Sequence, residues 1–451
     1  MAELSVAHRM ALGQLIGGVP DRTLRMLSLA VAGMPGDKAR DLELMLSQES
    51  IHRARRARGF GALAPLFHPR PDGVEAMTFP AGVLPRLWNL AAAREQDLLP
   101  LLDTDDDREA SRTAAVCGRL YASAAAAVRD QPEAVWPAGL CDPESRARGL
   151  IDLGHACDFG GLVHRALPSL KAWVGRPDGD QLAELRLLIR DASAMTSDGA
   201  QRLLDILFAH LADAALVLRL VVHTSSAAAR EAFLSESELA TFVERLIAGV
   251  QVRAQRVSAF QPGHPIASLR ADLIWCADVL QELDATIHLD REGPWGKTLR
   301  DARVRIGKRL GELLSGVTRV VDKTTPMQKV QTAGRMTRAV PRLEIAIEPK
   351  LVQAATDALA MVALLRNLAA PFGCEAQRGA LIQSLTVQLS EYGDLVIEEV
   401  NAGDAPEETP ALERAAMAAR FLEQIGAVTE ARAVRRRAAV AGGPAPMKRS
   451  A

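Results

Sequence analysis

The sequence lacks the short motifs that mark the common enzyme classes. It contains no Walker-type phosphate loop, no Gly-x-Ser-x-Gly elbow and no His-Glu-x-x-His pair. These absences disfavour P-loop nucleotide hydrolases, esterases built on a nucleophile elbow and zincin-type metalloproteases. A catalytic site assembled from dispersed residues would leave no such motif, so the absences do not exclude every enzyme.

Aromatic residues are also scarce, at 4% of 451 residues, although 48% of the chain is hydrophobic. The apolar content is mainly Ala, Leu and Val at helical spacing, which argues against a strand-rich fold. We therefore expect an all-α protein of irregular multi-helical bundles or a degenerate helical array, with no substantial sheet. No fixed internal period or recurring signature residue supports a regular solenoid.

Five cysteines are scattered without close pairs, which predicts neither a disulfide framework nor a zinc module, and fits a reducing cytoplasm. The first residues lack the pattern of a secretory signal. The best transmembrane candidate, Leu203 to Val222, is interrupted by charged residues, so we expect one buried core helix there instead. These features predict a cytoplasmic protein without a transmembrane segment.

Proline is unevenly distributed and divides the chain. Between Pro177 and Pro262 there is none, whereas prolines interrupt the first third repeatedly. We expect a domain of short helices over 1–145, a long-helix bundle over 146–322, a basic linker over 323–342, an acidic helical domain over 343–440 and a disordered tail over 441–451. The clearest single helix is predicted by an apolar seam at intervals of three and four residues: Leu299, Ala302, Ile306, Leu310, Leu313, Val317 and Val320.

The most distinctive feature present is a reversal of charge. Residues 293–342 hold 12 Lys and Arg against 3 Asp and Glu, whereas 343–411 hold 3 against 11. The simplest interpretation is that the two segments neutralise each other within one molecule, and a displaceable latch is the alternative. The basic residues that an anion or a partner would meet are Lys329, Arg335, Arg338 and Arg342, together with Arg305, Lys308 and Arg319 on the predicted helix.

A second basic cluster contains His52, Arg53, Arg55, Arg56 and Arg58, followed by Arg70 and Arg86, with Phe60 and Phe67 as candidate stacking surfaces for bases. Arginine outnumbers lysine 46 to 8, but heavy alanine use suggests a bacterial-like genomic composition, so we give this excess little weight. Basic runs of this kind are more often solvated helix faces than nucleic-acid sites.

Two His-x-x-Asp pairs, His155 with Asp158 and His210 with Asp213, have the spacing at which both side chains share a helix face. Helical bundles bind metals with such pairs, but further carboxylates are needed and the sequence identifies none. We expect these residues to be structural, and we expect no cofactor.

The sequence therefore favours a non-catalytic scaffold, adaptor or regulator that acts through protein-protein interaction, with a partner that the sequence does not identify. One alternative is a nucleic-acid-associated protein that uses the basic segment 293–342. The other is a metal-dependent helical enzyme around the two His-x-x-Asp pairs.

Overall fold

The computed structural model describes residues 5–103, 110–225, 229–331 and 337–441, and it confirms the predicted all-α fold. The described residues contain one sheet, a two-stranded antiparallel hairpin. The chain divides into two compact units, one formed by Met1–Ser226 with Glu236–Phe242 and one by Ala227–Ser235 with Val243–Ala451. Within the described residues, no helix has both the length and the apolar character needed to cross a bilayer.

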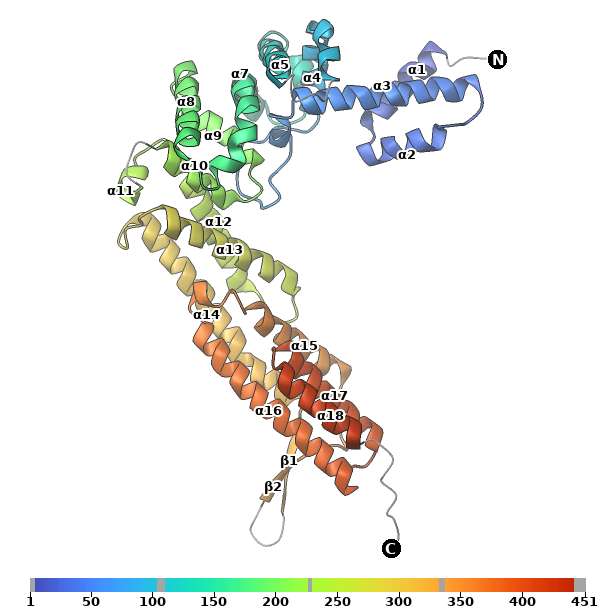
Figure 1. Ribbon diagram of the computed structural model, residues 1–451, viewed down its shortest axis with the longest axis vertical. Helices are drawn as coiled ribbons and strands as arrows, with labels where there is room; N and C mark the ends of the chain where they lie inside the picture. The colour runs from blue at the N-terminus through green and yellow to red at the C-terminus, as the bar shows by residue number, and fades with distance from the viewer. Residues whose placement is uncertain (1–4, 104–109, 226–228, 332–336, 442–451) are drawn as a thin grey trace. The chain divides into compact units, whose positions relative to one another are not determined.

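Unit 1 begins with a three-helix N-terminal arm, which is followed by a bundle centred on the pairing of α5 with α7 (Figure 1). Its elements are α1 (Val6–Gly18), α2 (Asp21–Val31), α3 (Asp37–Gly59), η1 (Ala64–Phe67), α4 (Val83–Arg94), η2 (Gln96–Leu102), α5 (Ala110–Asp130), α6 (Pro132–Val135), α7 (Pro143–Trp173), α8 (Gly179–Met195), α9 (Gly199–His210), η4 (Ala214–Leu216) and α10 (Val217–Thr224). The division of the chain thus differs from the expected boundary at residue 145, because α7 packs against α5, α8 and α9.

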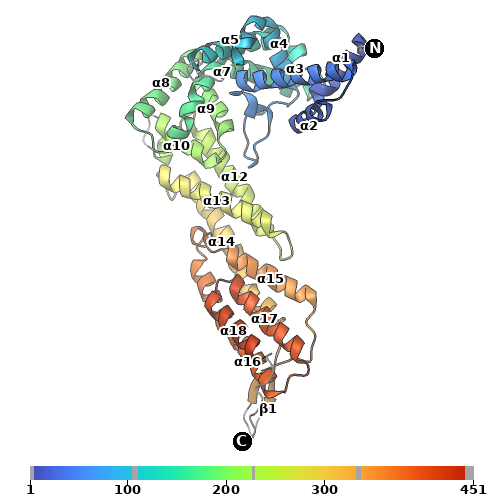
Figure 2. The same ribbon diagram turned by 45° about the vertical axis from the view of Figure 1, so that its right-hand side comes forward.

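Unit 2 is built on long helices, with the β-hairpin at one end of the bundle (Figures 1 and 2). Its elements are α11 (Glu231–Leu234), α12 (Ala240–Ala259, which begins in unit 1), α13 (Ile266–Thr286), α14 (Pro294–Asp322), β1 (Met327–Gln331), β2 (Thr337–Pro341), α15 (Pro349–Leu364), η5 (Ala370–Phe372), α16 (Glu375–Ala402), α17 (Glu408–Gln424) and α18 (Val428–Ala441). Part of the segment expected as a basic linker is therefore the hairpin, with Met327 opposite Pro341. The tail over 442–451 lies outside the described residues.

The predicted seam of α14 is buried from Leu299 to Val317. A carboxylate fixes the start of this helix. Glu231, which is buried, accepts hydrogen bonds from the backbone N–H of Trp295 (2.7 Å) and of Asp290 (2.9 Å). A negative charge at a helix N-terminus is stabilised by the free N–H groups and by the helix dipole. Burial of Glu231 is thereby compensated, and α11 is tied to α14.

The helix expected over Leu203 to Val222 is instead two helices, and an arginine far away in the sequence explains the break. Arg70 donates from Nη1 to the carbonyls of Phe208 (2.6 Å) and Leu211 (2.8 Å) at the end of α9. Its guanidinium also pairs with Asp72 and stacks on the Phe208 ring. The last carbonyls of α9 therefore have a charged partner, which stabilises the end of the helix at His210.

The same arrangement recurs and gives the arginine excess a structural role. Guanidinium groups donate to carbonyls at the ends of six further helices: Arg53 at α1, Arg58 at η2, Arg146 at α6, Arg219 at α7, Arg309 at α12 and Arg378 at α15. A cation near a helix C-terminus is favoured by the dipole, and the planar guanidinium can reach several carbonyls at once. Seven of the 46 arginines, Arg70 included, thus contact carbonyls at helix ends.

Candidate docking groove on the N-terminal arm

The N-terminal arm consists of α1, α2 and α3 and has a small core of its own. Four side chains form that core: Ile16, Leu24, Val31 and Leu46. Partly buried Leu12, Val19, Leu42 and Met45 surround them. Four buried side chains stabilise the arm by only about 6–12 kcal/mol before chain entropy is subtracted, so the arm depends on its polar contacts as well.

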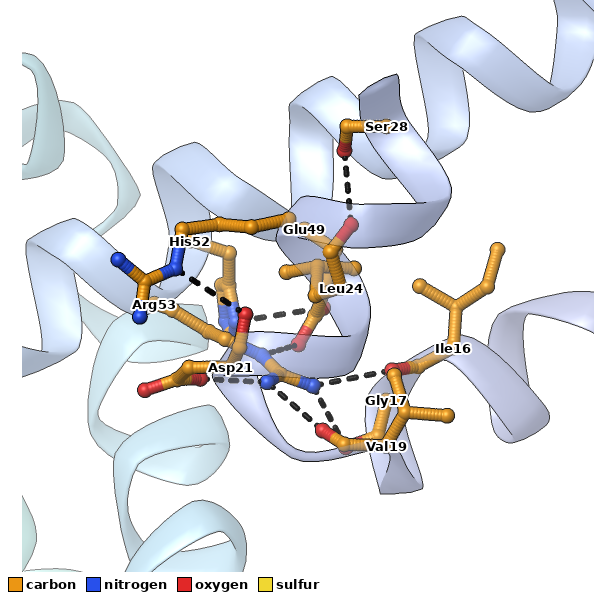
Figure 3. Close-up of polar contacts among 10 residues, drawn as sticks. Ile16, Gly17, Val19, Asp21, Leu24, Ser28, Glu49, His52 and Arg53 are labelled. Atoms are coloured by element: carbon orange, nitrogen blue, oxygen red, sulfur yellow. Dashed lines mark hydrogen bonds and ion pairs between the residues drawn. The ribbon is translucent and has the colours of Figure 1, made fainter. Parts of the chain in front are cut away.

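Arg53 of α3 is the main polar contact of the arm (Figure 3). It donates to the carbonyls of Ile16 (2.9 Å), Gly17 (3.2 Å) and Val19 (2.8 Å), which end α1. It also pairs with Asp21 at the start of α2 (2.6 Å) and with Glu49 one turn earlier on α3 (2.7 Å). The Arg53 side chain is 11% exposed, whereas its partner Asp21 is 76% exposed, so the bonds to the carbonyls of Ile16 and Val19 are better shielded from water than the pair with Asp21. One side chain therefore joins all three helices.

Beside this contact lies an open groove of about 590 Å³ between α1, α3 and α4. The residues from α3 follow one face of the helix at intervals of three and four. The groove is lined by Gly13 and Ile16 of α1, by Met45, Gln48, Glu49, Ile51, His52 and Arg55 of α3, and by Asn89 of α4. Its volume is in the range of small-ligand pockets, but its wall is open along a helix, which suits a peptide or a partner helix.

His52 lines the groove from α3 and contacts Trp88 of α4. The indole N–H of Trp88 donates to its Nε2 (2.9 Å), so Nε2 carries no proton and the imidazole is neutral. Burial lowers the pKa of His52, and the guanidinium groups of Arg53, Arg55 and Arg56 lower it further, while Glu49 opposes them. The neutral ring keeps Trp88 in place at the edge of the core of unit 1.

The arm exposes an unusual amount of apolar surface. Eight of the 22 exposed large apolar side chains in the described residues belong to the 54 residues from 6 to 59: Met10, Leu15, Met26, Leu27, Leu29, Met34, Leu44 and Ile51. Leu29 is 79% exposed, and Met10 and Leu15 are each 66% exposed. Single exposed apolar residues are ordinary, but this concentration on one small element is typical of an interaction surface.

No family model, curated protein or solved structure matches the chain.

The second basic cluster is largely engaged within the chain. Arg55 pairs with Asp103, and Arg58 donates to the carbonyl of Leu102. Phe60 and Phe67 are buried, so the expectation that they offer stacking surfaces for bases was wrong. Phe60 stacks on Tyr121, and Phe67 packs against Phe79.

In the described basic segment, Arg338 contacts an acidic helix. Arg338 on β2 pairs with Glu398 (2.8 Å) and lies 3.7 Å from Glu399 on α16, and Arg342 pairs with Glu344 (3.2 Å). Lys329 is exposed on β1, and Arg305, Lys308 and Arg319 are exposed on α14. Arg335 lies outside the described residues. The seven predicted cations thus do not form one uniform patch.

The two His-x-x-Asp pairs have separate structural partners. Asp158 of α7 pairs with Arg129 of α5, and the His210 N–H donates from Nε2 to the carbonyl of Ala62 (2.8 Å). Asp213 lies beyond the end of α9 and accepts from the backbone N–H of Ala215 (2.9 Å), so His210 and Asp213 do not share a helix. Within the described ranges no group of three or more His, Cys, Asp or Glu side chains could hold a metal ion. His155 and Asp158 line a pocket of about 260 Å³ beside α5.

The groove and the exposed arm were not predicted, although the sequence of α1 contains a signal for them. Its apolar residues Met10, Leu12, Leu15 and Ile16 fall on more than one side of the helix. A helix that is apolar on all sides is normally buried. In the described part of the chain only Ile16 among these four is fully buried, which leaves the others partly or largely uncovered.

Proposed function

We propose that this protein is an adaptor or scaffold whose N-terminal arm docks onto a partner protein. The observation that carries the proposal is the concentration of exposed apolar side chains on α1, α2, α3 and the α2–α3 connection, which holds Met34. Covering those eight side chains would contribute of order 10 kcal/mol before the costs of association are subtracted. The groove beside His52, which Ile51 lines among these eight, would seat a partner helix against α1 and α3, and the other seven would contact the partner outside the groove.

Paired substitutions test this proposal. Leu15→Glu with Leu29→Glu places two charges on the arm, and Ile151→Glu with Val304→Glu makes the same changes at residues of similar exposure elsewhere. The full chain and both variants are crosslinked to their neighbours in cells, and the captured proteins are quantified. We expect specific partners to be lost from the arm variant and retained by the control. Loss of the same partners from both variants, or from neither, would remove the arm from the interaction.

A second candidate function is binding of nucleic acid along α14. Arg305, Lys308 and Arg319 are exposed, and with a rotation of 100° per residue they fall within one sector of the helix. If they contact phosphates, affinity for a DNA or RNA 20-mer falls with salt, and reversing all three charges makes the dependence of log K on log salt shallower by about 2–3. Lys329→Glu is the control on the hairpin. An unchanged slope in the triple variant would exclude this surface.

A further inference from the structure

A second groove, of about 500 Å³, lies in unit 2 between α16 and α18. From α18 it is lined by residues at positions i, i+3, i+4, i+7 and i+8: Ala433, Arg436, Arg437, Val440 and Ala441. From α16 it is lined by Ile397 and Asn401, one turn apart. This spacing is that of a helix face covered by a neighbouring helix, yet Val440 is 81% exposed. The groove therefore lies between two helices whose shared face is not covered by a third helix in the described residues.

The two helices run parallel at this seam. Val434 of α18 packs at Gly393 of α16, Arg437 pairs with Asp394, and the lining continues toward the ends of both helices. Figures 1 and 2 show the same direction for α16 and α18. The C-terminal end of α16, with its partial negative charge, therefore lies at the end of the groove that Asn401 lines.

The charges on the groove select the kind of partner. Arg436 is exposed and has no carboxylate within ion-pair distance among the described residues, whereas Arg437 is already paired with Asp394. The residues that follow α18 in the sequence begin Gly-Gly-Pro and carry Lys448 and Arg449. A segment of that composition has poor helix propensity and the same sign of charge as Arg436, so it does not suit the seam.

We infer that the groove between α16 and α18 binds an amphipathic helix of a partner protein, antiparallel to both helices and with acidic residues in its first turn. In that direction the positive end of the partner helix meets the negative end of α16, and its acidic first turn lies over Arg436. The apolar face of the partner covers exposed Val440 beside buried Ile397. The contact extends over about two turns, because residues 433–441 span about 12 Å. This site is independent of the arm and lies in the other unit.

The test uses the full chain and a labelled, acetylated peptide of about 15 residues, with acidic residues in its first turn and leucines at positions i, i+3, i+4 and i+7. A second peptide has the same composition but carries its acidic residues in the last turn. Fluorescence anisotropy should show saturable binding of the first peptide and at least about tenfold weaker binding of the second.

Two variants and one control decide whether the site is this groove. Arg436→Glu should weaken binding of the first peptide at least about tenfold, and Val440→Lys should abolish that binding. Lys350→Glu on α15 is the control, because it changes the net charge as Arg436→Glu does, and it should leave binding of the first peptide unchanged. All three residues are exposed, so the variants should fold, and circular dichroism checks this. Equal binding of both peptides, or undiminished binding by the Arg436→Glu chain, would overturn the inference. So would a dimer in light scattering that Val440→Lys converts to monomer, because the occupant would then be a second copy.

Discussion

Replacing Arg53 should release α1 and α2 from the rest of unit 1. The residue makes five hydrogen bonds, three of them to carbonyls at the end of α1 and two to carboxylates. Hydrogen bonds to charged groups contribute about 1.5–3 kcal/mol each when buried, but several of these are near the surface and water replaces part of them. We therefore expect Arg53→Ala to cost about 2–4 kcal/mol, which is a large share of the stability that a four-residue core can provide.

The loss should be local and visible in amide hydrogen exchange. A cost of 2–4 kcal/mol accelerates exchange through local opening by about 30- to 800-fold, and the effect should be confined to peptides from residues 6–31. Arg53→Lys should recover only part of the protection, because an ammonium group cannot reach three carbonyls and two carboxylates at once. Arg55→Ala is the matched control, since it removes a neighbouring ion pair with partly exposed Asp103. If Arg53→Ala changes exchange in α1 and α2 by less than threefold, or no more than Arg55→Ala does, then Arg53 does not hold these helices against α3.

Three further predictions concern stability. Gly307→Ala should destabilise unit 2 by about 1–3 kcal/mol in urea unfolding, because a Cβ there overlaps the carbonyl oxygen of Phe372. Gly316→Ala on the same helix is the control: its Cβ meets open space, so it should be neutral or stabilising. Equal effects of the two substitutions would show that the overlap with Phe372 is not the cause. Arg414→Lys should accelerate hydrogen exchange in the β-hairpin but not in α14. The reason is that buried Arg414 donates to the carbonyls directly after β2, which are those of Arg342, Leu343 and Ile345. Unaltered exchange in the hairpin would refute this role of Arg414. Burial lowers the pKa of four histidines in unit 1: His52, His164, His210 and His223. The unfolded state therefore binds protons more readily, so stability that is present above about pH 6.5 should be lost as the pH falls below that value. Urea unfolding at pH 7.5 and 5.5, with the unit 2 tryptophans replaced by Phe, tests this expectation, and an unchanged unfolding midpoint would contradict it.

The elements that local patterns could predict are those whose burial repeats along one helix. The seam from Leu299 to Val317 predicts α14 because each residue of the seam meets the core of unit 2, so the period alone carries the information. The apolar pattern from Leu203 to Val222 likewise predicts one helix, although the structure has two, α9 and α10. The signal that separates them is Arg70, 138 residues before Phe208, and no local window contains both.

The hairpin and the candidate grooves were not predicted for a related reason. Lysine, arginine and proline in the segment 323–342 suggested a linker, but contacts with α16 and the ion pairs of Arg338 place β2 against the bundle. The groove on the arm depends on which faces of α1 and α3 remain uncovered, and that is a property of packing. Sequence patterns indicate which residues are apolar, but they do not indicate which of those residues lack a neighbour.

The guanidinium groups at helix ends have a consequence for how the chain folds. Several come from distant positions: Arg53 is 37 residues from Ile16, Arg219 is 45 from Val174, and Arg70 is 138 from Phe208. A contact across that separation forms only after the intervening chain has been closed into a loop, so it forms late compared with the helical turns themselves. The final turns of α1, α7 and α9 should therefore fray in early folding intermediates and become fixed together with the tertiary structure, which makes the ends of these helices reporters of the last folding steps.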